Sequence, residues 1–183
     1  MIREYLLNKT HAISNPFNKR VDVYLVRHGE TDLNRLGVLQ GSIEEPLNSY
    51  GRDQALQAAR VLSQIDIAEV VTSPQIRARE TADIISRHLK VSVQENTLLR
   101  ERDWGIYEGK KREERDATGE GVEPIEALEK RVISAFTAIV TNTQQPCAIV
   151  THSGFIKSLI NVLFGEPPSV IKNGEIIRVS NNT

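Results

Sequence analysis

Two histidines and two arginines follow predicted strands, and their residue types suit work on an anionic group. Arg27 and His28 come directly after a short β-branched run, and His152 follows a second apolar run. Arg77 falls in the first turn of a helix that follows a third run. Ligands of an open parallel sheet gather at the carboxyl ends of its strands. The spacing therefore predicts two imidazoles and two guanidiniums at one edge of one sheet.

These four side chains could together transfer a phosphoryl group. Such a group carries charge on three equatorial oxygens, and arginine offers a planar, permanently charged fork that matches them. A neutral imidazole can attack phosphorus through one ring nitrogen if the other donates to a backbone or carboxylate oxygen. The phosphohistidine so formed divides one displacement into two easier ones. A nearby carboxylic acid must still protonate the leaving oxygen.

Other phosphatase chemistries find no support in the sequence. A nucleophilic Cys147 would need an arginine at position 153, where a serine stands. The four histidines are scattered along the chain, and they do not supply the clusters of Asp and His that a two-metal site needs.

Six short motifs occur in an order that is typical of one family. They are Arg27-His28-Gly29-Glu30-Thr31 with Asn34; Gln40-Gly41 with Pro46-Leu47 and Gly51; Ser73-Pro74 with Arg77-Ala78 and Glu80-Thr81; Leu99, Glu101 and Gly105 with Glu108-Gly109; Val150-Thr151-His152-Ser153-Gly154; and Asn173-Gly174-Glu175. Over roughly residues 21–180, this ordered set resembles the histidine phosphatase superfamily, the phosphoglycerate mutase-like proteins.

The resemblance implies a role for each matching residue and implies that no metal or organic cofactor takes part. His28 is the expected nucleophile, and Glu101 is the expected general acid, which then becomes the base that activates water. His152 is the third expected catalytic residue and also contacts the phosphoryl oxygens. The residues expected to bind phosphate are Arg27, Asn34, Arg77 and Ser153, and those expected to contact the rest of the substrate are Gln40 and Gly41.

Two of these assignments have a rival nearby in the sequence. Arg79 could compete with Arg77, which is preferred because the motif places it nearer the sheet edge. Glu30 lies within the first motif and is a rival to Glu101 as the proton donor.

The segment at about 106–128 is charged and interrupted by glycines, which predicts a small cap over the site. Its basic run Lys110-Lys111-Arg112, with Arg115 nearby, is interleaved with acidic residues and is expected to be a solvated face rather than a site for further phosphates. Trp104 could either wall a pocket or fill the core.

Short apolar runs alternate with segments of helical periodicity along the chain. Strands are expected at 21–26, 69–72, 91–94, 147–150 and 176–179, and helices at 49–63, 74–89, 124–140 and up to 163. This alternation predicts a three-layer α/β/α fold with a mostly parallel sheet, with 176–179 as an edge strand. Residues 1–20 lie outside the alternation as an N-terminal extension, and 21–183 are expected to form one histidine phosphatase domain.

Composition excludes several other classes of protein. Lysines and arginines number 23 against 24 acidic residues, for a net charge of −1, so no global field recruits nucleic acid or an acidic membrane. The single Cys147 rules out an internal disulfide framework. No apolar run approaches the roughly 18 residues that span a bilayer, and the N-terminus lacks the core of a secretory signal. We expect a cytoplasmic protein.

The modest cap favours transfer of the phosphoryl group to water over return to a second substrate oxygen. Only about 50 residues separate Glu101 from His152, and the chain ends soon after Val179. The expected activity is therefore a metal-independent phosphomonoesterase acting on a small phosphorylated metabolite. A phosphoglycerate mutase-type phosphotransferase, a protein phosphohistidine phosphatase and a non-catalytic phosphate-binding module remain as alternatives.

Overall fold

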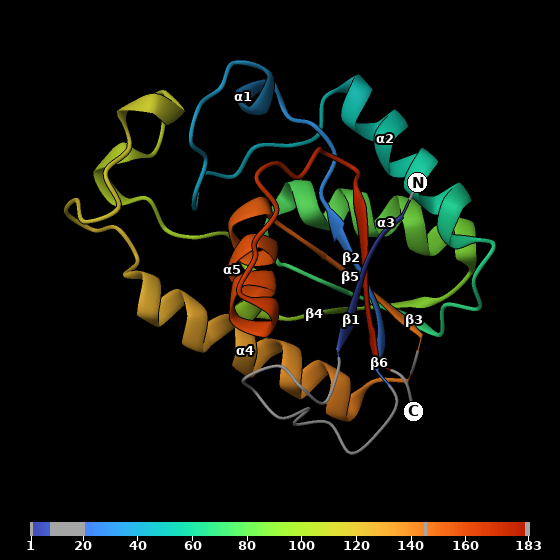
Figure 1. The fold of residues 1–183 in the computed structure, drawn as a ribbon. Helices are drawn as coiled ribbons and strands as arrows, with labels where there is room; N and C mark the ends of the chain where they lie inside the picture. The colour runs from blue at the N-terminus through green and yellow to red at the C-terminus, as the bar shows by residue number, and fades with distance from the viewer. Residues whose placement is uncertain (1, 8–20, 145, 182–183) are drawn as a thin grey trace.

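A six-stranded sheet runs through the centre of the molecule (Figure 1). The computed structural model describes residues 2–7, 21–144 and 146–181. The strands are β1 Arg3–Leu7, β2 Asp22–Arg27, β3 Glu69–Thr72, β4 Ser92–Glu95, β5 Cys147–Thr151 and β6 Ile176–Asn181. Their order is β1-β6-β2-β5-β3-β4, and every neighbouring pair is parallel except β2 with β6. The predicted mostly parallel sheet is confirmed.

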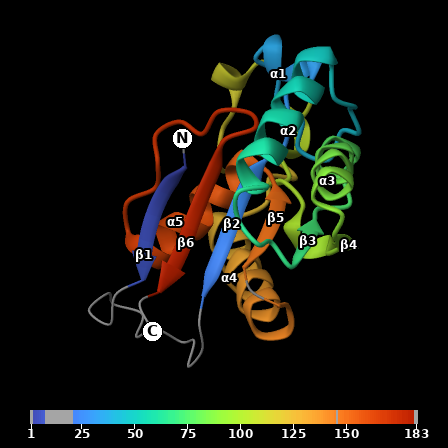
Figure 2. The ribbon, with the colours of Figure 1, turned by 90° about the vertical axis from the view of Figure 1, so that its right-hand side faces the viewer.

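Helices cover both faces of this sheet, which confirms the three-layer fold (Figure 2). The helices are α1 Asp32–Arg35, α2 Ser49–Leu62, α3 Ile76–Leu89, α4 Ile125–Asn142 and α5 Ser153–Phe164. Successive side chains of β2 alternate between the two layers: Leu25 belongs to the core under α4 and α5, and Val26 to the core under α2 and α3. Because both faces are covered, residues 23–26 of β2 and 147–150 of β5 form continuous apolar runs.

The strand β1 at one edge of the sheet was not predicted. It pairs in parallel with β6, so the expected edge position of residues 176–179 is wrong. Residues 3–7 belong to the sheet although the sequence placed them in an extension. Residues 8–20 of that extension lie outside the described residues, and the domain boundary after residue 20 stays a prediction. The signal was weak because β1 is short and mostly exposed or half-buried.

The segment between β4 and α4 carries short 3-10 turns instead of regular helices. In Figure 1 it extends to the left of α1 and α5. Bridges from Lys111 to Val38 and from Trp104 to Val122 hold it in place. Gly105 adopts a φ of 51° at a point where a Cβ atom would collide with the backbone of residues 120–122. This segment forms the roof of the cavity described below. Within the described part of the chain, no helix is long and apolar enough to cross a membrane.

Candidate active site

His28 stands at the carboxyl end of β2 with its ring orientation fixed by the backbone. Its side chain is 2% exposed, and its Nδ1 lies 2.7 Å from the Gly29 carbonyl oxygen. A carbonyl can only accept a hydrogen bond, so Nδ1 carries the proton and donates it. The other ring nitrogen, Nε2, therefore keeps its lone pair. This is the tautomer that an attacking imidazole needs.

His152 lies beside His28 because their strands are neighbours in the sheet. Arg27 of β2 pairs with Thr151 of β5, and each histidine is the next residue. The two ring centroids are 5.1 Å apart. The His152 ring is fully buried, and its Nε2 lies 2.8 Å from the Ser73 hydroxyl oxygen. The two rings therefore lie side by side at the ends of their strands.

Two buried guanidiniums flank the rings, and both are held by backbone carbonyls. Arg27 donates to the Ile171 carbonyl at 2.7 Å. Arg77, which is 1% exposed, donates to the carbonyls of Ile43 at 2.7 Å and Gly41 at 2.9 Å. Among the described residues neither arginine forms an ion pair with a carboxylate. Their positive charge is thus free to act on an anion.

Burial and the two arginines keep both histidines neutral. Burial is the main cause that holds the pKa of His28 well below 6.5, followed by the charges of Arg77 and Arg27. The pKa of His152 is lowered in the same way, with burial first and then Arg77. Burial also lowers the pKa of Arg27 to about 10, so it stays charged at neutral pH. The site therefore combines neutral imidazoles with cationic guanidiniums.

Glu101 lines the same cavity as His28 and is held at the N-terminus of α5. Its Oε1 accepts from the Arg102 backbone N–H at 2.9 Å, and its Oε2 from that of Gly154 at 3.2 Å. A Cβ atom at Gly154 would collide with the Glu101 carboxyl group. The glycine thus lets this carboxyl group approach the helix end.

The loop that carries Glu101 is fastened by Arg131, a residue that sequence reasoning missed. Arg131 donates to the carbonyls of Leu98 and Arg100, both at 2.8 Å. It also forms a two-pronged ion pair with Glu123, with N–O distances of 2.8 and 2.6 Å. No local pattern marks this residue, because its partners come from two separate segments, the loop at 98–101 and Glu123.

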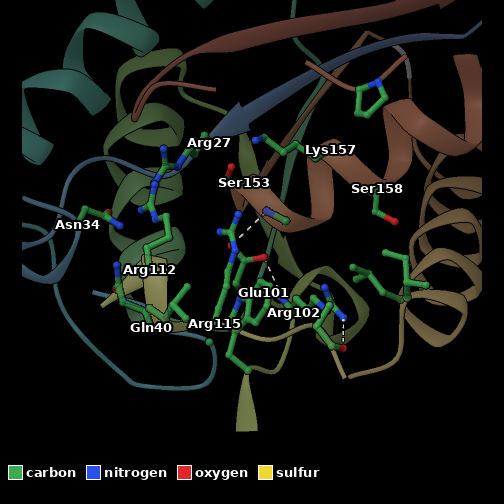
Figure 3. A pocket seen from close by; sticks show the side chains of 18 of the residues that line it. Arg27, Asn34, Gln40, Glu101, Arg102, Arg112, Arg115, Ser153, Lys157 and Ser158 are labelled. Atoms are coloured by element: carbon green, nitrogen blue, oxygen red, sulfur yellow. Dashed lines mark hydrogen bonds between the residues drawn. The ribbon is translucent and has the colours of Figure 1, made fainter. Parts of the chain in front are cut away.

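Nearly all the residues expected in the site line one cavity of about 700 Å³ (Figure 3). The expected residues in its wall are Arg27, His28, Asn34, Gln40, Gly41, Arg77, Glu101 and Ser153. His152 is not in the wall and lies behind it. Gly41 also has a second task, because its carbonyl accepts hydrogen bonds from Arg77 and from Gln75.

The two rival residues lie elsewhere. Arg79 is exposed and its guanidinium is 3.7 Å from the carboxylate of Glu95. The carboxylate of Glu30 accepts a hydrogen bond from Asn48 at 3.0 Å and lines a different pocket. The geometry therefore favours Arg77 and Glu101.

The outer cavity holds basic residues that the sequence did not assign to the site. Arg112 and Arg115 of the expected solvated face line the cavity, as does Lys157 of α5, whereas Lys110 does not. Trp104 also lines it, with the Arg102 guanidinium 4.6 Å from its ring centroid. No group of three or more His, Cys, Asp or Glu side chains that could hold a metal ion occurs in the described ranges.

Comparison with known sequences identifies the family. Residues 23–182 match the family model of the histidine phosphatase superfamily (branch 1). The chain belongs to this superfamily, as its motifs predicted. It is 34% identical over 156 residues to an uncharacterized phosphatase PhoE of Bacillus subtilis, a match that covers 81% of this chain and 80% of that protein.

Other relatives carry different activity names. A putative phosphoserine phosphatase 2 of Hydrogenobacter thermophilus is 30% identical, over 78% of each chain. A probable phosphoglycerate mutase GpmB of Klebsiella pneumoniae is 40% identical, but that match covers 48% of this chain and 41% of that protein. Among solved structures, YhfR of Bacillus stearothermophilus superimposes with a TM-score of 0.78 at 26% identity, covering 85% of this chain and 88% of that one.

Proposed function

We propose that the protein is a metal-independent phosphomonoesterase that hydrolyses a small phosphorylated metabolite through a phosphohistidine on His28. The observation that carries the proposal is the pair of neutral imidazoles, 5.1 Å apart, beside two guanidiniums that form no ion pair with a carboxylate of the described residues. Such a cage stabilises negative charge on a phosphoryl group while leaving a nucleophile with a free lone pair.

In the first step Nε2 of His28 attacks phosphorus, and the bond from phosphorus to the leaving oxygen breaks. Glu101, protonated for this step, gives its proton to that oxygen. Arg27, Arg77 and His152 bind the equatorial oxygens, whose charge they stabilise. The product alcohol leaves, and the phosphoryl group stays on His28.

In the second step water attacks the phosphohistidine, and the phosphorus–nitrogen bond breaks. The Glu101 carboxylate accepts a proton from that water, which restores its acid form. His28 regains its lone pair, and inorganic phosphate is released. One carboxyl group thus serves as acid and then as base.

One comparison favours transfer to water over transfer within the substrate. The phosphatase-named relative PhoE matches 81% of this chain, whereas the mutase-named relative matches 48%.

The size of the cavity bears on the class of substrate. Its volume of about 700 Å³ lies within the usual range for small-molecule sites. A pocket of this size with a roof suits a metabolite better than the surface of a phosphorylated protein.

The first experiment traps the intermediate. Rapid acid-free quenching with p-nitrophenyl phosphate should give a phosphohistidine on His28 that is labile to acid and stable to base. His28→Ala should abolish both trapping and turnover, whereas His88→Ala, a change on an exposed face of α3, should leave both unchanged. Retained turnover in His28→Ala would contradict the covalent route. Faster movement of phosphate between phosphoglycerate oxygens than release of inorganic phosphate would show a mutase instead.

The second experiment tests the proton donor. Glu101→Gln should slow hydrolysis of an alkyl phosphate far more than that of p-nitrophenyl phosphate, because only the poor leaving group depends on protonation. Equal losses for the two substrates would remove Glu101 from the role of general acid.

A further inference from the structure

The side-chain amide of Gln75 joins two loops of the site from behind the cavity. Its Nε2 donates to the Gly41 carbonyl at 2.6 Å, and its Oε1 accepts from the Glu101 backbone N–H at 2.8 Å. A carbonyl oxygen only accepts and a peptide N–H only donates, so these partners fix which way the amide points. The residue is 6% exposed and is not in the cavity wall. Gln75 therefore influences the site through these loops and not by contact with a molecule in the cavity.

The position of Gln75 before α3 leaves its side chain available for this bridge. It is the N-cap residue of α3, where a side-chain oxygen usually accepts a backbone N–H of the first turn. The Gln75 side chain makes no such bond to α3, a helix that the structure describes throughout. Instead, the Glu44 carboxylate accepts from the Ile76 N–H at 2.7 Å. The helix end thus has another partner, and the Gln75 amide reaches across to the two loops.

The Gly41 carbonyl also anchors Arg77, an arginine of the proposed phosphate cage. It accepts from Arg77 at 2.9 Å in addition to Gln75, which occupies both lone pairs of the oxygen. A chain of hydrogen bonds therefore leads from the Arg77 guanidinium to the backbone of Glu101. On the far side, Arg131 donates to the Glu101 carbonyl at 3.4 Å. The backbone that carries the Glu101 carboxyl group is thus held at its N–H and at its C=O.

We propose that Gln75 is a positioning residue that fixes the Glu101 carboxyl group relative to Arg77. The inference rests on the proposed function, in which Arg77 binds the phosphoryl oxygens and Glu101 protonates the leaving oxygen. Proton transfer depends on distance and angle, and a misplacement of about 1 Å can cost about a hundredfold in rate. Loss of the amide should harm proton donation more than binding of the phosphoryl group, because Arg77 keeps the Ile43 carbonyl as a second anchor.

Gln75→Met tests the proposal, because methionine has a similar length but makes neither hydrogen bond. For an alkyl phosphate, kcat/KM should fall about tenfold to a hundredfold, since its leaving oxygen needs the proton. For p-nitrophenyl phosphate the loss should stay below about threefold, since its leaving group departs without a proton. Gln94→Met is the matched control: it removes a glutamine hydrogen bond to Glu69 on β4, outside the cavity wall, and should leave both rates unchanged. Equal losses for the two substrates in Gln75→Met would overturn the proposal.

The Glu101→Gln background separates positioning from a general loss of structure. With the proton donor already removed, Gln75→Met should lower kcat/KM of the alkyl phosphate by less than about threefold more. Losses that multiply in the double variant would show that Gln75 acts independently of Glu101, which contradicts the proposal. Gln75→Asn carries its amide on a shorter stem that cannot reach both partners. It should show the same preferential loss for the alkyl phosphate, and it decides the question if Gln75→Met does not fold.

Amide hydrogen exchange measured by NMR tests the bridge without turnover. The Glu101 N–H should exchange about fivefold faster in Gln75→Met than in the wild-type protein, as expected for one lost hydrogen bond. The Gln144 N–H, which donates to the Glu69 carboxylate at 2.8 Å, is the control and should not change. An unchanged exchange rate at Glu101 would refute the bridge whatever the activity. A faster rate in a protein that hydrolyses neither substrate would instead refute the phosphatase proposal alone.

Discussion

Acidification should destabilise the protein through its two buried histidines. The folded structure holds the pKa of His28 and of His152 well below 6.5, mainly by burial and then by the charges of Arg77 and Arg27. In the unfolded chain both imidazoles take up protons near their ordinary value of about 6.5. Below that pH the unfolded state binds more protons than the folded state, so the free energy of unfolding falls as pH falls.

The size of the effect follows from the linkage relation. An imidazole that stays neutral in the folded state costs about 1.4 kcal/mol for each pH unit below its unfolded pKa. Between about pH 7 and pH 5.5 this gives about 1.3 kcal/mol for each ring and about 2.5 kcal/mol for both. The loss is large beside a typical total stability of about 5–15 kcal/mol. It begins near pH 6.5 and continues down to the folded-state pKa values.

Urea unfolding at the two pH values measures this loss. His28→Asn should lower the pH dependence by the share of one ring, about 1.3 kcal/mol, whatever it does to the stability at neutral pH. His88→Asn is the control, because it removes an imidazole that the fold leaves exposed. Carboxylates contribute equally to the pH dependence of unfolding in the wild-type protein and in both variants, so their contribution cancels in the comparison. An unchanged pH dependence in His28→Asn would refute the argument that this ring is held neutral.

Three further predictions concern the groups around the rings. Gly154→Ala should displace the carboxyl group of Glu101, so kcat for an alkyl phosphate should fall more than for p-nitrophenyl phosphate in steady-state assays. Arg131→Met, which breaks an ion pair that is about 90% buried, should cost about 3 kcal/mol in urea unfolding. Inorganic phosphate at about a hundred times its Kd should add about 2.7 kcal/mol, or about 5–11 °C in Tm, and Arg77→Met should remove most of that shift.

The pairing of the two histidines could be predicted because local signals specify it. The runs before His28 and His152 are buried on both faces and stop abruptly at the histidine motif. Strands of this kind become neighbours in the interior of a parallel sheet, and their carboxyl ends then coincide. The helices α2 and α3 were equally clear, since their buried residues recur at three- and four-residue spacing.

Features that depend on distant segments could not be predicted in this way. The strand β1 has its partner β6 about 170 residues further along the chain, and three of its five residues are exposed. Arg112 and Arg115 belong to a run of mixed charge that reads as a solvated surface. Their approach to Lys157 follows from the path of the roof segment over α5. Short-range periodicity carries no information about such a path.

The way the arginines are anchored explains how the site can combine rigidity with strong attraction for an anion. A carboxylate partner would hold a guanidinium firmly but would also cancel its charge. Backbone carbonyls hold Arg27 and Arg77 at 2.7–2.9 Å while contributing only a dipole. Burial is the main cause that lowers the pKa of the adjacent rings, and the remaining arginine charge lowers it further, which keeps the lone pair of His28 free. In the mechanism that we propose, the same two side chains would prepare His28 for its attack and attract the phosphoryl group, so the proposed chemistry depends on the carbonyl anchors.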